Sequence, residues 1–146
     1  EAGVAEGIDQ HSATPLTASV VIVGSTAALF GEEGHTDYAA SKSAIAQGLT
    51  LSLKNEIVRL VPNGRVNAVC PGWTRTPMAE VGLEDREGVR DVMQTRPLQQ
   101  IAESEDIANA ILYLSSDKIA GHLTGTILPV SGGMEGRLLH ARDDLA

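Results

Sequence analysis

The chain has few aromatic residues, a single cysteine and no long apolar run. One Trp, two Tyr and one Phe are all the aromatic side chains among 146 residues, so its core has to be aliphatic. Cys70 has no second cysteine to pair with, which excludes an internal disulfide and agrees with a reducing, cytoplasmic location. No apolar run approaches the roughly 20 residues that a membrane-spanning helix needs, so we expect no membrane partner.

Positive charge is also scarce. The chain has 11 Lys and Arg residues against 19 Asp and Glu, a formal net charge of −8 at pH 7. Such a balance disfavours contact with a phosphate backbone, and we expect no nucleic-acid partner. The four histidines are scattered without metal-ligand spacing, so no metal site is expected. A length of 146 residues with 42% hydrophobic and 21% charged residues is typical of one globular domain.

Three short apolar runs predict a parallel β-sheet. They are Ser19–Val23, Arg65–Cys70 and Thr126–Val130, and β-branched residues are frequent in them. Pro129 has no backbone N–H to donate, which places the third strand at an edge of the sheet. A long helical segment separates the first two strands, and this is the pattern of a βαβ unit with parallel strands. The sequence therefore predicts an α/β fold with about three strands and flanking helices.

The helical segments follow from capping signals and apolar spacing. Residues 26–35 are expected to form a loop, and the long helix is expected to begin at Thr36 or Asp37, either of which could cap it. It should run to Val61, where Pro62-Asn63-Gly64 ends it. Its second half carries more apolar surface than one packed face needs, which indicates a second partner such as another subunit.

Further helices are expected later in the chain. Acidic residues at 103–106 suit the positive end of a helix that ends near Ser115. The polar stretch 73–100 is expected to hold one or two short helices, for example over residues 86–95, and to lie where a substrate lid would sit. The connection before residue 17 and the polar tail after Glu135 are expected to have no regular structure.

One pair of residues carries a candidate chemistry. Tyr38 and Lys42 are four apart in a run of helix formers, so a phenol and an ammonium lie on the same helix face. Ser25 ends the first predicted strand, at the edge of the sheet where ligands of α/β proteins bind. Taken alone, Tyr-x-x-x-Lys is a weak signal, because a surface tyrosine beside a solvated lysine gives the same pattern. Further stretches in order along the chain make it stronger.

The ordered set resembles that of a known family. Ser25, Tyr38-Ala39-Ala40-Ser41-Lys42, Pro71-Gly72-Trp73-Thr74-Arg75-Thr76-Pro77 and Val130-Ser131-Gly132-Gly133 follow one another at characteristic spacing. The chain resembles the short-chain dehydrogenase/reductase family of the ordinary, single-domain type, over residues 19–133. This resemblance implies a Rossmann-like doubly wound sheet, NAD or NADP as cofactor, and a homo-oligomer of two or four subunits. It also implies a small ketone or secondary alcohol as the substrate.

The resemblance also implies roles for individual residues. Tyr38 would give a proton to the substrate oxygen or take it away, Lys42 would bind the nicotinamide ribose, and Ser25 would hold the substrate oxygen. A free tyrosine has a pKa of about 10 and is a poor base at neutral pH, but a neighbouring ammonium favours the phenolate. For Trp73, simple loop packing is the alternative to a place in the substrate wall. Cofactor contacts are implied for Tyr38, Lys42, Pro71, Gly72, Thr74 and Thr76, and substrate contacts for Ser25, Trp73 and Met78.

The chain also departs from the family pattern. Thr74 replaces Val or Ile in the proline-glycine loop, and Ser131 replaces Asp in the closing turn. The Gly-x-x-x-Gly-x-Gly loop that holds the pyrophosphate is missing from the sequence. We therefore expect residues 1–146 to be a partial domain without its N-terminal glycine-loop half and to be inactive alone. The choice between NAD and NADP cannot be read from the chain.

Two other functions have to be weighed. A non-catalytic remnant of the fold could serve as a binding or oligomerisation module, and this alternative stays open. A sugar epimerase of the extended family would share Tyr-x-x-x-Lys, but the stretch 71–77 and the Gly132-Gly133 ending disfavour it.

Overall fold

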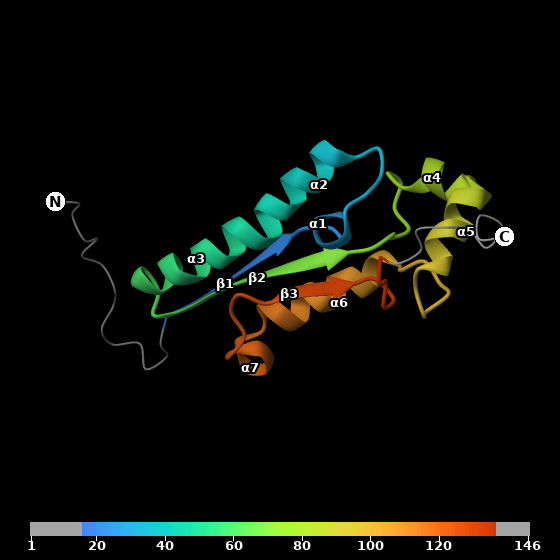
Figure 1. The fold of residues 1–146 in the computed structure, drawn as a ribbon. Helices are drawn as coiled ribbons and strands as arrows, with labels where there is room; N and C mark the ends of the chain where they lie inside the picture. Colours follow the sequence, from blue (N-terminus) through green and yellow to red (C-terminus); the bar gives the residue numbers. More distant parts are fainter. Residues whose placement is uncertain (1–15, 137–146) are drawn as a thin grey trace.

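Three parallel strands form the centre of the structure, a computed structural model that describes residues 16–136 (Figure 1). The strands β1 (Thr17–Val23), β2 (Asn63–Pro71) and β3 (Ile127–Val130) lie in the order β1-β2-β3. Both pairings are parallel. The three predicted strands and their direction are thus confirmed, and β3 with its proline lies at an edge of the described sheet.

The central strand β2 is buried along most of its length. Val66 and Val69 are almost completely buried, and full burial of such a side chain stabilises a fold by about 1.5–3 kcal/mol. Cys70 packs with Ala28 and Ala46 as a small apolar side chain. A Cβ on Gly24 would lie 2.8 Å from the Cys70 sulfur and 3.1 Å from the Ala46 Cβ. Only glycine at position 24 therefore lets the long helix pack this closely on the sheet.

That helix covers one face of the sheet in four consecutive pieces (Figure 1). They are α2 (Thr36–Ser43), the π-helical segment η1 (Ala44–Leu49), α3 (Thr50–Glu56) and the 3₁₀ turn η2 (Ile57–Arg59). The predicted extent is confirmed to within two residues, but the sequence did not predict the π-helical segment. The buried Thr50 hydroxyl donates to the Ile45 carbonyl, five residues earlier, at 3.1 Å. This bond satisfies a buried polar group within the wider helical turn.

Two expectations for residues 26–37 are wrong. The long helix begins at Thr36, as predicted, but its N-cap is His35 rather than Thr36 or Asp37, and no side chain caps this end. Asp37 lies instead in the first turn, where its negative charge suits the helix dipole. The expected loop contains a single helical turn, α1 (Ala27–Phe30), and the Ser25 side chain accepts a hydrogen bond from its first N–H.

The opposite face of the sheet carries α6 (Ser104–Ser115), followed by the short α7 (Asp117–Ala120) (Figure 1). The acidic start of α6 is confirmed as a capping box, in which Asp106 accepts a hydrogen bond from the Glu103 N–H at 2.9 Å. The polar stretch before it forms α4 (Glu80–Glu84) and α5 (Arg86–Gln94), as predicted. The sequence did not predict α7.

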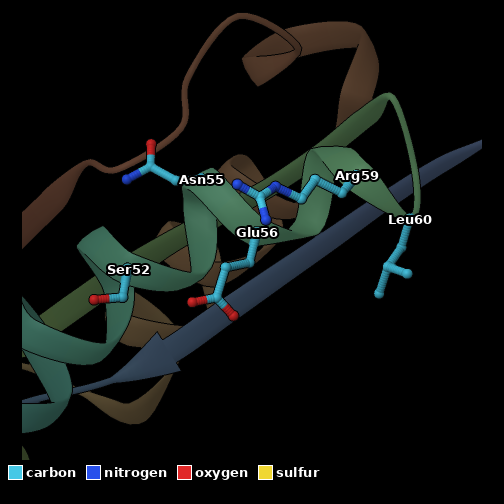
Figure 2. Close-up of a pocket in the computed structure, with 5 residues that line it drawn as sticks. All are labelled: Ser52, Asn55, Glu56, Arg59 and Leu60. Atoms are coloured by element: carbon cyan, nitrogen blue, oxygen red, sulfur yellow. The ribbon is translucent and has the colours of Figure 1, made fainter. Parts of the chain in front are cut away.

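Apolar side chains remain exposed on the outer surface of the long helix. Leu60 is 79% exposed, and Leu49, Leu51 and Val58 are also exposed. A shallow groove runs along the end of this helix, lined by Ser52, Asn55, Glu56, Arg59 and Leu60 (Figure 2). The broad apolar surface predicted from the sequence is therefore present, and a second packing partner for it stays a prediction.

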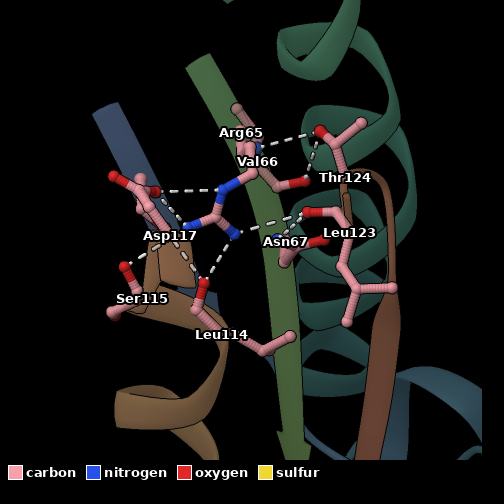
Figure 3. Close-up of polar contacts among 9 residues, drawn as sticks. Arg65, Val66, Asn67, Leu114, Ser115, Asp117, Leu123 and Thr124 are labelled. Carbon is pink, nitrogen blue, oxygen red and sulfur yellow. Dashed lines mark hydrogen bonds and ion pairs between the residues drawn. The ribbon is translucent and has the colours of Figure 1, made fainter. Parts of the chain in front are cut away.

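A buried arginine joins β2 to the helices on the second face (Figure 3). Arg65 is only 4% exposed, and its guanidinium donates to the Leu114 carbonyl at 2.7 Å and to the Ser115 carbonyl at 3.2 Å. These carbonyls belong to the last turn of α6, where a positive charge is favourable. Arg65 Nη2 also lies 2.7 Å from Asp117 Oδ1. Strand and helix end are thus held by charge-assisted hydrogen bonds.

Asn67 closes the same end of the sheet from β2. Its side-chain amide donates to the Leu123 carbonyl at 2.9 Å and accepts from the Thr126 N–H at 2.9 Å. The segment that leads into β3 is therefore fixed by a buried side chain of the neighbouring strand.

The connection up to Pro15 and the tail from Arg137 lie outside the described residues. Among residues 16–136, none of the helices has both the length and the apolar character that crossing a bilayer requires.

The Asp117 carboxyl makes stability depend on acid pH. Hydrogen bonds from Thr17 and Arg65 hold the pKa of Asp117 below its usual value. A lowered pKa in the folded state contributes stability above the unfolded value of about 3.9, and this contribution disappears as pH falls through the folded value. We expect wild type to be more stable than Asp117→Asn above about pH 5 and the difference to shrink below about pH 4. Urea unfolding between pH 3 and 7 measures this difference, with Glu84→Gln on exposed α4 as the control. A difference that stays constant over this range would contradict the assignment.

Candidate active site

The carboxyl ends of the three strands meet at one edge of the sheet. Hydrogen bonds join the segments that follow them: the Thr26 N–H donates to the Pro71 carbonyl at 2.9 Å, and the Gly72 N–H donates to the Val130 carbonyl at 2.9 Å. Ligands of open α/β sheets bind outside this edge. The parallel sheet therefore brings Ser25, the loop from Pro71 and the turn at Ser131 together, as the sequence predicted.

Tyr38 and Lys42 lie on α2 with their side chains adjacent. The Lys42 ammonium nitrogen is 5.7 Å from the centre of the Tyr38 ring. It also donates to the carbonyl of Val23, the last residue of β1, at 3.1 Å. The lysine therefore ties α2 to the end of the strand that leads into Ser25. It also places a positive charge beside a half-exposed phenol.

Ser25 is held by the first turn of α1. Its hydroxyl oxygen accepts from the Ala27 N–H at 3.1 Å, which leaves the hydroxyl hydrogen available to donate. The preceding Gly24 continues the sheet by donating to the Val69 carbonyl at 2.8 Å. A fixed hydroxyl donor at the sheet edge is suited to binding a carbonyl oxygen.

The loop after β2 has a fixed backbone. The Thr74 hydroxyl donates to the Gly72 carbonyl at 3.0 Å, and the Thr76 hydroxyl oxygen accepts from the Ala79 N–H at 3.3 Å. Thr74 also pairs with Ala102 in an isolated β-bridge. The backbone of this loop is therefore held by hydrogen bonds within the loop and by its pairing with Ala102.

Trp73 and Met78, the two loop residues expected to contact the substrate, lie in different surroundings. The Trp73 ring is 3.6 Å from the point where a Cβ on Gly82 would lie, so Trp73 packs on α4. Met78 is 94% exposed. Loop packing, the alternative weighed for Trp73, is thus present, and contact of either side chain with a substrate stays a prediction.

Cys70 lies behind the site and is not suited to act as a nucleophile. Burial raises the pKa of its thiol, against the opposing effects of the Ser25 backbone and the Lys42 charge. A buried thiol with a raised pKa is a weak nucleophile at neutral pH. Among residues 16–136, no group of three or more His, Cys, Asp or Glu side chains could hold a metal ion.

The groove on the outer surface of the long helix is a separate feature. Its residue Arg59 is 21 positions after Tyr38, which corresponds to about 30 Å along a helix. It therefore does not belong to the site at the strand ends.

The sequence did not single out Arg65, Asn67 or Arg96, all of which are buried. Asn67 could have been noticed as a polar residue inside an apolar β-strand. Arg65 could have been noticed as a charged residue at the start of the same strand. Arg96 follows α5 in a polar stretch, and nothing in the local sequence distinguishes it from exposed arginines.

Comparison with known proteins identifies the family. A family model described as Enoyl-(Acyl carrier protein) reductase matches residues 5–135. The chain belongs to the short-chain dehydrogenase/reductase family. Relatives that match are named as dehydrogenases and reductases, among them structures with bound NADP or NADH, so the resemblance found in the sequence is confirmed.

Individual members of the family show how far the similarity extends. A 3alpha-hydroxysteroid dehydrogenase from Mediterraneibacter gnavus is 42% identical over 113 residues, which are 77% of this chain and 43% of that protein. A structure from Agrobacterium tumefaciens, assigned as a 2-deoxy-D-gluconate 3-dehydrogenase with bound NADP, superposes with a TM-score of 0.73 at 32% identity. The alignment covers 80% of this chain and 46% of that one.

A 4-hydroxyisoleucine dehydrogenase in complex with NADH has a TM-score of 0.72 at 30% identity, over 79% of this chain and 46% of that one. The chain thus spans less than half the length of these relatives. Their structures confirm the predicted fold class, part of a Rossmann-like parallel sheet.

The close contact between Gly72, at the start of the loop after β2, and Ser131 can be tested by mutation. A Cβ at this residue would lie 3.1 Å from the Ser131 Cα and 3.2 Å from its Cβ, closer than such atoms normally approach. We expect Gly72→Ala to destabilise the protein by about 1–3 kcal/mol, as overpacking does. Gly48→Ala is the matched control, because nothing lies within 4 Å of an added Cβ there and alanine favours a helix. Thermal unfolding followed by circular dichroism compares the two, and equal stabilities would contradict a tight Gly72–Ser131 contact.

Proposed function

We propose that the complete protein, meaning the natural chain that contains these residues, is an NAD(P)-dependent oxidoreductase. It interconverts a ketone and a secondary alcohol, with Tyr38 as general acid and base. The observation that supports this most is the adjacent Tyr38–Lys42 pair, tied to the end of β1 at the sheet edge that carries Ser25. Membership of a family of oxidoreductases supports it independently.

The residues present fit a nicotinamide cofactor. Lys42 has three N–H donors and uses one on the Val23 carbonyl, which leaves two for the ribose hydroxyls. The loop from Pro71 to Thr76 presents a fixed backbone beside the end of β3, suited to a carboxamide. When bound, NAD or NADP supplies the hydride in reduction and accepts it in oxidation.

The chain's own residues manage the proton. In reduction, the Ser25 hydroxyl donates a hydrogen bond to the substrate oxygen, and the Tyr38 hydroxyl transfers its proton to that oxygen as it gains charge. In oxidation, the Tyr38 phenolate takes the alcohol proton. The Lys42 ammonium stabilises the phenolate in either direction by its charge.

We propose the substrate only as a small or medium-sized ketone or secondary alcohol. The relatives compared above include a hydroxysteroid dehydrogenase, a protein assigned as a deoxygluconate dehydrogenase and a hydroxyisoleucine dehydrogenase, so family membership leaves the substrate open. A cytoplasmic, homo-oligomeric protein is part of this proposal, and the exposed apolar side chains of the long helix would pack between subunits.

Replacement of Tyr38 tests the proposed proton transfer. Tyr38→Phe removes one hydroxyl, and we expect carbonyl reduction in the complete protein to fall by about 10²–10⁴-fold, with cofactor affinity nearly unchanged. The measurements are NAD(P)H oxidation with a panel of ketones and a cofactor titration. Tyr113→Phe is the matched control, because both tyrosines are 43% exposed and Tyr113 lies on α6. Equal turnover of the two variants would refute the role of Tyr38, and a wild type without any turnover would favour the non-catalytic module.

A second prediction concerns the 146 residues by themselves. They contain no Gly-x-x-x-Gly-x-Gly loop, and we propose that they form the catalytic part of a domain whose pyrophosphate site is made elsewhere. The isolated chain should therefore bind NADH only weakly and should not catalyse. Titration of NADH fluorescence with the purified chain measures this. A dissociation constant in the micromolar range would overturn the proposal.

A further inference from the structure

Arg96 lies where the end of the polar stretch 73–100 meets the turn that follows β3. It comes two residues after α5, and its neighbours pair with that turn: the Leu98 N–H donates to the Gly132 carbonyl at 3.1 Å, and the Glu135 N–H donates to the Thr95 carbonyl at 3.1 Å. The Arg96 Cδ is 3.5 Å from the point where a Cβ on Gly132 would lie. Arg96 is thus at the same edge of the sheet as the candidate active site.

The guanidinium of Arg96 is buried and only partly paired. The residue is 5% exposed, and Nη1 donates to the Gln100 carbonyl at 3.1 Å. Nε and Nη2 are buried as well and have no acceptor among the described residues 16–136. Burial lowers the pKa of this group, but an arginine stays protonated in a protein. Two buried donors of a charged group without acceptors are unfavourable, so an acceptor is expected in the functional state.

The two unpaired atoms of Arg96, Nε and Nη2, indicate which kind of hydrogen-bond acceptor would fit. Nε–H and Nη2–H point the same way along one edge of the planar guanidinium, and this edge matches the two oxygens of a carboxylate. Arg65 uses the same edge within this chain, although its Nε and Nη2 share one oxygen, Oδ1 of the Asp117 carboxylate, at 3.3 and 2.7 Å. The bond from Nη1 to Gln100 fixes the plane of Arg96, so its free edge keeps one direction.

We propose that Arg96 binds a carboxylate of the substrate through Nε and Nη2, which makes the substrate an oxo acid or the corresponding hydroxy acid. This inference rests on the proposed function. The position of Arg96 favours a substrate carboxylate over a protein side chain. Arg96 adjoins the Ser131–Gly133 turn, and that turn contacts Gly72 of the proposed cofactor loop. Both nitrogen atoms are shielded from solvent, so this proposal requires the residues that cover them to move apart when the carboxylate binds.

The test compares charged and neutral substrates in the complete protein. The probes are 2-, 3- and 4-oxo carboxylates of four to six carbons, each paired with its methyl ester. We expect wild type to reduce at least one acid with a kcat/KM more than tenfold above that of its ester. Arg96→Gln should lose at least tenfold on the acid and stay within twofold on the ester. Arg96→Lys, which keeps the charge without the planar edge, should recover only part of the preference, and Arg86→Gln on α5 is the control.

A binding measurement separates this proposal from the proposed function. Succinate should raise the thermal midpoint of wild type and not of Arg96→Gln, and succinamide should raise neither. This result without any ketone turnover supports the carboxylate site and refutes the oxidoreductase activity. Turnover in wild type without preference for acids overturns the carboxylate proposal, even if Arg96→Gln does not fold. Equal losses on acid and ester overturn it too. They would mean that water or a protein carboxylate, from another segment or a second copy, pairs with Arg96 as a structural residue.

Discussion

Parallel pairing of β2 with both of its neighbours is the constraint on which the rest of the structure depends. Parallel strands have to be joined by crossovers, so the helices lie on the two faces of the sheet and the segments that follow the strands gather at one edge. Ser25, the loop from Pro71 and the turn at Ser131 are far apart in sequence and adjacent for this reason alone. The candidate site is thus a consequence of topology before any side chain contributes to it.

The two ends of this sheet differ in how their buried arginines are paired. Arg65 lies near the start of β2, where carbonyls of α6 and the Asp117 carboxylate accept its hydrogen bonds. Arg96 lies at the opposite end, beside the turn after β3, with one edge unpaired among the described residues. The paired arginine holds strand and helix together, whereas the unpaired edge of Arg96 is the feature from which we inferred a carboxylate site. This contrast agrees with the proposal that the Arg65 end of the sheet is structural and the Arg96 end binds a ligand.

The sequence predicted the elements whose signal is local and missed those that depend on tertiary contacts. The β-branched runs identified all three strands, and the spacing of Tyr38 and Lys42 placed them correctly on one helix face. The helix begins at Thr36, as expected, but the N-cap position before it is occupied by His35, and neither Thr36 nor Asp37 caps it although both are good capping residues. In the π-helical segment the Ile45 carbonyl accepts a hydrogen bond from the buried Thr50, and burial of Thr50 is a tertiary property.

The site residues follow the same division. Tyr38, Lys42 and Ser25 could be found because their spacing is a motif, whereas Arg96 could not, because its burial comes from contact with a turn more than 30 residues later. Such a long-range contact cannot be predicted from the neighbouring residues in the sequence. For Trp73, composition could not separate loop packing from substrate contact, since an exposed wall and a packed loop both use an aromatic ring.

Small side chains behind the site determine its geometry. Gly24, Ala46 and Cys70 let the long helix approach the sheet more closely than larger residues would allow. At that separation the Lys42 side chain reaches the Val23 carbonyl and remains beside Tyr38. A larger residue at position 24 would move the helix outward and lengthen this hydrogen bond. Small residues at positions 24, 46 and 70 are therefore also what allows the Lys42 ammonium, with Tyr38 beside it, to reach the end of β1.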